Sequence, residues 1–474
     1  MKTIRDFRAQ EMQITPATIA GTLKKTLNDR ASWNEDRWNN YVTQSEASSA
    51  VSGSHVVVGW NDFETLWYAN SITNWAVSHD GGKTFAANLG LPVDSIVTET
   101  WGDPAVAVAP DGTFYIATLA QVTQAAVNYS GVVLYRSTDN GDTFNWVQGY
   151  YAVDTADFYD KELIAVDPVS GTVYVTWTWF NNASPLYTIF SWTRTAGGSS
   201  STSIVAQNDT GLQGSIPAVD RSGNVYVAYE SWDGGGVPSI KIKKSATSGA
   251  SWDTERNVAT LSGTLGEALH PEASAFCGRN ALKGNIRVNE FPSLAIDTRA
   301  SGAGAGNLYV AFNASNSFSS GGCPSWGCID VFLTRSIDGG TTWSAPLKAN
   351  ARKAGDLSDK FMPWVAVNGK GKVGLLYYDK AKTPYVAGAS NDNWFMSANV
   401  RRFSPSLTLI DSTKLGKEFP TVTNHDWTSA CYMGDYNSIT NNKSKNDDIF
   451  YAAWGDNRYG DPDIQFSKIV PVLP

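Results

Sequence analysis

Acidic side chains recur at the start of a series of short apolar segments in this sequence. The acids in this position are Glu46, Asp103, Asp160, Glu290, Asp359 and Asp435. Lys161 and Lys360 directly follow two of these acids, and Tyr436 directly follows Asp435. Two carboxyl groups beside a glycosidic bond can cleave it, and Tyr and Trp rings stack on sugar rings. These residue types therefore indicate carbohydrate chemistry, provided that the fold brings them together.

We predict two sets of site residues from this pattern. The candidate catalytic residues are Asp103, Asp160, Glu290, Asp435 and Tyr436. The candidate substrate-binding residues are Lys161, Lys360, His270, His425, Trp427 and Arg458. The alternative interpretation is that the acids cap neighbouring backbone groups and hold water or a cation.

The sequence indicates no cofactor. It contains no nucleophile motif, no phosphate-binding loop and no histidine cluster with the spacing of metal ligands. Because the acids would offer oxygen ligands, a structural Ca²⁺ ion is the metal that would suit them.

A long-period repeat predicts how these residues are positioned. A short apolar strand, a turn with Gly and a second β-branched or aromatic strand recur, as in S-I-P-A-V-D-R-S-G-N-V-Y-V-A-Y at 215–229. The other copies fall at 46–60, 102–117, 160–177, 290–312, 361–378 and 434–454. A third strand follows each pair, so each unit predicts a four-stranded antiparallel sheet, and radial repetition of such sheets makes a β-propeller. We predict an all-β fold with seven blades, six blades being the alternative, whose first strands line a channel and whose acids gather at one mouth.

A second repeat, Ser-x-Asp-x-Gly-x-Thr/Ser-aromatic, marks four of the units. It reads S-I-D-G-G-T-T-W at 336–343, S-H-D-G-G-K-T-F at 78–85, S-T-D-N-G-D-T-F at 137–144 and S-A-T-S-G-A-S-W at 245–252. This stretch resembles the Asp-box, or BNR repeat, of the sialidase-like propeller superfamily. The resemblance implies that each box is a turn between the third and fourth strands of a blade. We expect its Asp and Ser to bind backbone N–H groups and its aromatic residue to pack between blades.

The resemblance does not extend to the residues of the sialidase active site. That family binds the carboxylate of sialic acid with three arginines, the first of them in an Arg-Ile-Pro motif, and no such motif occurs here. Glu46, Asp160 and Glu290 stand where that arginine would be, and carboxylates would repel an anionic ligand. An atypical sialidase would need another clamp, for which Arg287, Arg352 and Arg458 are available.

Several interpretations of the function therefore stay open. The leading one is a glycan-directed propeller that binds or cleaves carbohydrate at an acidic, aromatic-rich mouth, and as an enzyme it would be a glycoside hydrolase. A polysaccharide lyase, with His270 or His425 as the base, and an atypical sialidase are alternatives. A non-catalytic interaction scaffold is the alternative from another class, because a fold alone does not determine function.

The composition limits which partners the protein can bind and where in or outside the cell it is expected. The chain has 474 residues and a net charge of −8, which argues against nucleic acid as a partner. No apolar run is long enough to span a membrane. The first thirty residues lack the apolar core of a signal peptide, but a glycan ligand favours an extracellular or cell-surface location. Cys323 and Cys328 flank a compact loop suited to a local disulfide, but the pairing of these two cysteines, Cys277 and Cys431 stays open, and all four could be buried thiols.

The predicted domain organisation is simple. Residues 41–474 form a single propeller, and residues 1–40 form an N-terminal extension. We expect the extension to supply a strand that closes the ring, for which residues 11–15 are suited, or to dock a protein partner.

Overall fold

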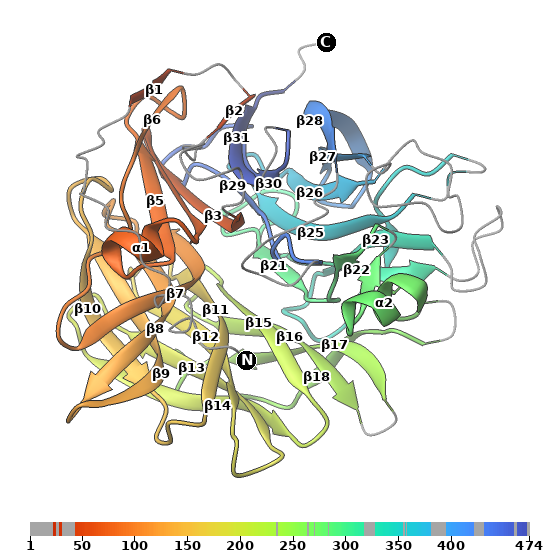
Figure 1. The fold of residues 1–474 in the computed structure, drawn as a ribbon. Coiled ribbons are helices and arrows are strands. Elements are labelled where there is room, and N and C mark those ends of the chain that lie inside the picture. The colour runs from red at the N-terminus through yellow and green to blue at the C-terminus, as the bar shows by residue number, and fades with distance from the viewer. Residues whose placement is uncertain are drawn as a thin grey trace.

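The computed structural model describes residues 22–24, 28–30, 43–233, 236–262, 265–269, 271–282, 284–316, 328–353, 356, 358–380, 395–420, 431–458 and 462–471. The sheets form a ring around a central axis (Figure 1). Seven antiparallel sheets make the blades, six of them with four strands and the first with one strand more. The prediction of a seven-bladed propeller is confirmed, and the six-bladed alternative is wrong.

The first three blades come from the N-terminal half of the chain. Blade 1 contains β3 (Gln44–Ser52), β4 (His55–Asp62), β5 (Thr73–Ser78) and β6 (Thr84–Ala87), with the short helix α1 (Thr65–Ala69) between β4 and β5. Blade 2 contains β7 (Val97–Val108), β8 (Phe114–Gln124), β9 (Val127–Ser137) and β10 (Asn145–Tyr151). Blade 3 contains β11 (Phe158–Val166), β12 (Val173–Phe180), β13 (Tyr187–Arg194) and β14 (Ser200–Asn208).

The other four blades follow in chain order. Blade 4 contains β15 (Leu212–Val219), β16 (Val225–Asp233), β17 (Val237–Ser245) and β18 (Arg256–Thr260). Blade 5 contains β21 (Ser293–Ile296), β22 (Leu308–Asn316), β23 (Cys328–Ser336) and β24 (Leu347–Lys348). Blade 6 contains β25 (Lys360–Val367), β26 (Val373–Asp379), β27 (Phe395–Phe403) and β28 (Leu409–Pro420). Blade 7 contains β29 (Ser438–Thr440), β30 (Phe450–Asp456) and β31 (Asp463–Ile469).

The N-terminal segment adds strands to the two blades that flank the closure of the ring. β2 (Asn28–Arg30) pairs with β31 and completes blade 7, and β1 (Thr22–Lys24) pairs with β6 at the outer edge of blade 1. Residues 11–15, which the sequence suggested for the closing strand, lie outside the described residues. Blade 7 therefore combines strands from both ends of the chain.

The innermost strands form a closed ring. Each first strand contacts the first strands of both neighbouring blades, and β29 contacts β3. The apolar core lies between the blades, where Val57 and Trp75 of blade 1 pack with Phe114 and Ile116 of blade 2. Such packing is expected of strands with apolar residues on both faces, because each blade is covered on two sides.

The Ser-x-Asp repeats form the turns between third and fourth strands. Ser336 Oγ donates to Asp338 Oδ1 (2.7 Å) and accepts the N–H of Gly340 (2.9 Å), a residue with a φ of 81°. Thr342 donates its N–H and its hydroxyl to the Asp338 carboxylate, at 2.9 and 2.6 Å. These bonds lower the pKa of Asp338 to about 2. The box is thus a self-contained turn, as its residue types predicted.

The aromatic residues of three of the boxes contact the preceding blade. Phe85 of blade 1 packs edge-on against Phe466 of blade 7, with 5.0 Å between ring centroids. Phe144 of blade 2 packs in the same way against Trp75 of blade 1, at 5.5 Å. In the eroded box, Trp252 donates its indole N–H to Ser203 of blade 3 (2.9 Å). The boxes therefore help to hold neighbouring blades together.

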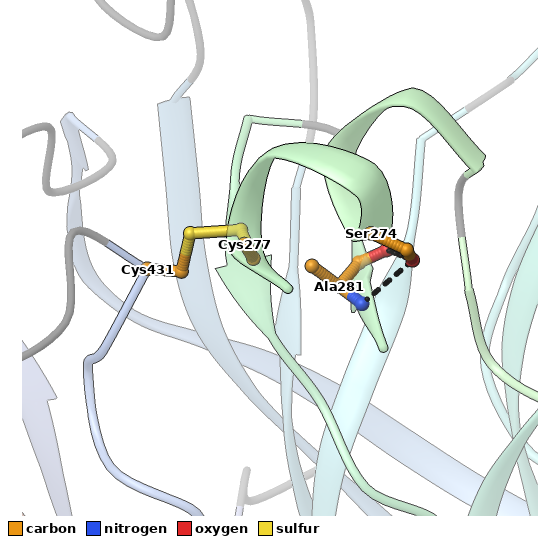
Figure 2. The surroundings of a disulfide bond; sticks show 4 residues. All are labelled: Ser274, Cys277, Ala281 and Cys431. Carbon is orange, nitrogen blue, oxygen red and sulfur yellow. Dashed lines mark hydrogen bonds between the residues drawn. A yellow bond between two sulfur atoms is a disulfide. The ribbon is translucent and has the colours of Figure 1, made fainter. Parts of the chain in front are cut away.

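An insertion between blades 4 and 5 carries the helix α2 (Pro271–Cys277) and the hairpin of β19 (Ala281–Leu282) and β20 (Ile286–Arg287). Figure 2 shows Cys277, at the end of α2, in a disulfide with Cys431, and Ser274 Oγ accepting the N–H of Ala281 (3.0 Å). Cys328 is disulfide-bonded as well, whereas Cys323 lies outside the described residues. Among the described segments, no helix is long and apolar enough to cross a membrane.

Candidate functional site

Five charged side chains meet on the axis of the propeller. Lys161 Nζ lies 3.0 Å from Glu46 Oε1, 2.7 Å from Asp103 Oδ2 and 2.8 Å from Asp435 Oδ2. Arg287 also binds the Asp435 carboxylate, and its Nε donates to Oδ1 at 2.8 Å. These residues come from blades 1, 2, 3 and 7 and from the insertion. We call Glu46, Asp103, Lys161, Arg287 and Asp435 the charged cluster.

A repeated β-bulge aims three of these side chains at the axis. In β3, β7 and β11 the residue pairs 46–47, 103–104 and 161–162 each oppose a single residue of the second strand. The first residue of each pair is left-handed, with φ of 57° at Glu46, 56° at Asp103 and 56° at Lys161. Blades 4 and 6 have the same bulge at Gly214 and Met362. Because bulges re-aim side chains, three equivalent positions in neighbouring blades carry groups that can bind one another.

Neutral polar groups complete the contacts of the cluster. Asn61, at the end of β4, accepts the Asp103 N–H (2.6 Å) and donates to Glu46 Oε2 (3.0 Å) and to the Tyr432 hydroxyl (3.2 Å). The Arg287 guanidinium lies over the Tyr432 ring, 4.2 Å from its centroid. The Tyr436 hydroxyl donates to the Pro104 carbonyl (3.2 Å). Two tyrosines and one amide thus hold the ionic groups in a fixed arrangement.

The cluster is buried, but unevenly. The side chains of Glu46 and Asp435 are 0% and 1% exposed, whereas those of Asp103 and Arg287 are 11% and 15% exposed. Asp103, Lys161 and Arg287 therefore form the part of the cluster that solvent reaches. A cavity of about 20 Å³ beside Lys161 and Asp435 is also lined by Tyr436 and Trp364, and it has room for about one water molecule.

Burial and neighbouring charges separate the pKa values of the two innermost acids. Burial raises the pKa of Glu46 well above its ordinary value, and the charge of Asp103 adds to the effect. Burial would also raise the pKa of Asp435, but Arg287 and Lys161 outweigh it and hold that pKa far below its usual range. Glu46 therefore keeps its proton to a higher pH than Asp435 does.

Further acids lie beside the cluster. Asp160 accepts a hydrogen bond from Gln213 Nε2 (2.6 Å), and burial raises its pKa. Glu162 is fully buried, neither of its carboxylate oxygens has a hydrogen-bond partner within the described part of the chain, and burial raises its pKa well above the ordinary value.

A second carboxyl pair lies between blades 4 and 5, where Glu290 approaches Glu230 at the end of β16. Both side chains are buried, and the N–H of Ala268 donates to Glu290. Burial raises the pKa of Glu290 to about 7, and burial together with the charge of Glu290 raises the pKa of Glu230 well above its ordinary value. This pair is separate from the charged cluster.

The structure distributes the predicted site residues over several places. Asp103, Asp435 and Lys161 meet in the charged cluster, with Tyr436 beside Lys161 at 5.8 Å from Nζ to the ring centroid. Lys360 instead pairs with Asp356 (2.9 Å) and Asp379 (3.0 Å) within blade 6. Arg458 pairs with Asp456 in blade 7. His270, His425 and Trp427 lie outside the described residues, so their assignment stays a prediction.

Sequence reasoning missed Asn61, Tyr432, Glu162 and Glu230. Tyr432 and Asp435 share the run C-Y-M-G-D-Y, and this proximity was a usable signal. Asn61, Glu162 and Glu230 had no such signal, because their positions depend on the register of strands in different blades.

No described group of three or more His, Cys, Asp or Glu residues is arranged to hold a metal ion. The carboxylate oxygens that would suit Ca²⁺ accept hydrogen bonds from Lys161, Arg287 and Asn61 instead. The structural Ca²⁺ ion considered from the sequence stays a prediction.

No protein-family model matches this sequence, and no curated protein matches it. Among solved structures, the chain is similar to a protein of unknown function from Dyadobacter fermentans, with 14% identity, a TM-score of 0.47 and coverage of 95% of this chain and 99% of that one. It is also similar to an α-L-arabinofuranosidase from Fusarium graminearum (9% identity, TM-score 0.47, 80% and 95% covered) and to a Hadza microbial sialidase (13%, 0.43, 96% and 94%). Similarity at this level leaves the activity to be argued from the residues of this chain.

Proposed function

We propose that the protein is glycan-directed and that it binds or cleaves carbohydrate at the charged cluster. The observation that carries the proposal is the convergence of Glu46, Asp103 and Lys161, all left-handed, on one point of the axis. Left-handed non-glycine residues cost of the order of 1–3 kcal/mol each, and they gather at functional sites. Bulges that served blade packing alone would not require charged residues at this position.

The separation of pKa values supports cleavage over simple binding. In glycosidases one carboxyl group stays protonated and acts as the acid while the other stays ionised. The pKa values of Glu46 and Asp435 are shifted in these two directions, upward for Glu46 and downward for Asp435. Asp103 would contact the ligand, since it is the more exposed carboxylate. Tyr432 and Tyr436 would hold the ionic groups in position beside the ligand.

The charges favour a neutral glycan over a sialylated or uronate-containing one. Lys161 and Arg287 already bind carboxylates of the protein, so an anionic ligand would have to displace Asp103 or Asp435. Like charges about 4 Å apart repel by about 4 kcal/mol at an effective dielectric of 20. A sialidase or lyase activity is accordingly the weaker alternative.

A non-catalytic scaffold is the second candidate, and the burial of Glu46 and Asp435 favours it. Buried ion pairs also serve to fix one arrangement of a fold, and this network joins blades 1, 2, 3 and 7. An extracellular or cell-surface location fits both candidates and is supported by the Cys277–Cys431 disulfide, because disulfides persist in oxidising compartments.

The test is a screen of the full chain against neutral, sialylated and uronate-containing polysaccharides, with product release and binding both measured. We expect turnover or binding on neutral polymers. Asp103→Asn should abolish turnover while leaving the urea midpoint within the range of the control Asp209→Asn, an exposed acid in the loop between β14 and β15. Activity that survives Asp103→Asn would contradict the assignment of the site to the charged cluster. No turnover and no binding on any of the three classes would favour the scaffold.

A further inference from the structure

The central channel is wide and open at the end opposite the charged cluster. Its volume is about 900 Å³, and its wall consists of the first strands and the hairpin turns that follow them. Leu163 and Trp364 line both this space and the small cavity beside Lys161, and so form its floor. We call the end near the cluster the closed end and the other the open end.

Cations dominate the open end. The charged residues that line the channel are Arg221, Asp297, Arg299, Lys370, Lys443 and Lys445. Arg299 and Asp297 neutralise each other, with Nε 2.8 Å from Oδ1. The other four cations come from the hairpins of blades 4, 6 and 7, and none of them pairs with a carboxylate in the described part of the chain. A chain with a net charge of −8 thus carries a local excess of positive charge here.

The wall that carries these cations is built by specific contacts. Lys443 donates its backbone N–H to the Val51 carbonyl (2.9 Å), which joins the blade 7 hairpin to blade 1. Asn442 exchanges two hydrogen bonds with the backbone of Gly53, at 3.0 and 2.7 Å. Asn368 donates to Asp448 (2.8 Å) and so joins the hairpins of blades 6 and 7. The hairpins that carry the cations are therefore held in place by hydrogen bonds to neighbouring blades.

The channel wall also affects the charge of Lys443. Its side chain is exposed to the channel, yet the protein around it desolvates the ammonium group and lowers its pKa. An anion bound nearby would reverse this effect, because an opposite charge favours the protonated amine. Beside the cations stand hydroxyl and amide groups of residues such as Ser438, Thr440 and Asn441, and these can donate to the oxygens of a ligand.

We propose that the open end of the channel binds a small ligand that carries phosphate or sulfate groups. Four unpaired cations around a cavity of about 900 Å³ match a sugar phosphate or sugar sulfate in charge and size, since sites for small molecules have volumes of about 300–1,000 Å³. The lysine ammonium is a common partner of such groups. This site is independent of the charged cluster, because the floor of the channel separates them.

The experiment is a calorimetric titration of the full chain at low salt with glucose 6-phosphate, glucose 6-sulfate, inorganic phosphate and glucose. We expect the first two to bind and glucose to fail. The variant Lys370→Gln/Lys443→Gln/Lys445→Gln should weaken binding at least tenfold, and the control Lys83→Gln/Lys353→Gln/Lys417→Gln should not change it. The control removes equal charge from exposed sites that do not line the channel.

The outcomes separate the sources of the anion. Inorganic phosphate that binds as tightly as the sugar phosphate supports the site and assigns it to the free ion. Absence of binding by every anion at millimolar concentration would overturn the proposal. So would equal affinities of the channel variant and the control variant.

Discussion

The two ends of the channel hold charges in opposite ways. At the closed end, Lys161 and Arg287 are paired with carboxylates of the protein, and their side chains are 8% and 15% exposed. At the open end, Arg221, Lys370 and two further lysines face a cavity without a carboxylate partner among the described residues. In the first arrangement the cations are already paired within the protein. The second leaves charge available to a ligand, because nothing in the wall neutralises it.

Removal of a single cation from each end tests this difference most directly. Lys161→Met would leave three buried carboxyl groups without their shared partner, and breaking a buried ion pair costs about 3–5 kcal/mol. Lys370→Met at the open end should change the free energy of unfolding by less than about 0.5 kcal/mol, as exposed substitutions usually do. Urea denaturation of both variants measures the contrast. Equal changes in the free energy of unfolding would mean that the ion pairs of Lys161 do not stabilise the fold.

The pH dependence of stability examines the second carboxyl pair at the closed end. The pKa of Glu290 is about 7 in the folded chain and lower in the unfolded chain, so the folded state binds more protons between about pH 4.5 and pH 7. Stability should therefore fall by about 3 kcal/mol as the pH rises through this window and level off above it. In Glu290→Gln the decline should be smaller by about this amount, because only the other buried acids with raised pKa values still contribute, whereas Asp209→Asn should retain the full decline. A decline of unchanged size in Glu290→Gln would assign it to other groups.

The smallest effect is expected at the open end. Since Lys370, Lys443 and Lys445 repel one another, their combined replacement by Gln should stabilise the ligand-free chain by less than about 1 kcal/mol at low salt. In 0.5 M salt the gain should disappear, because the screening length falls to a few ångströms. Thermal unfolding at two salt concentrations provides the measurement. A loss of stability would show that these lysines have partners in the fold.

The sequence was sufficient to predict the scaffold because the scaffold is repetitive. The strand pattern occurs seven times and the turn four times. A wrong assignment of secondary structure in one copy is therefore corrected by comparison with the other copies. The turn chemistry of Asp338 could be assigned from residue types alone, since all of its partners lie within four residues.

The site could be predicted only in part because its contacts are not local. The acids at the strand starts were visible, but Lys161 as their common partner depends on a bulge that turns it toward the axis. Arg287 reaches Asp435 from 148 residues away in the chain. Lys360 also directly follows an acid, yet it pairs with Asp356 and Asp379 within its own blade. The blade 6 residue at the bulge position of Lys161 is Met362, so adjacency to an acid did not identify the lysine that faces the axis.

The Cys277–Cys431 disulfide has a consequence for the integrity of the chain. Its cysteines are 154 positions apart, and all strands of blades 5 and 6 lie between them. These two blades therefore form a covalent loop within the ring of seven. A protease that cuts a surface loop of either blade would leave both fragments attached to the rest of the molecule. The two fragments would separate only after reduction of the disulfide. A cut outside residues 277–431 would instead leave two fragments with no covalent bond through this disulfide.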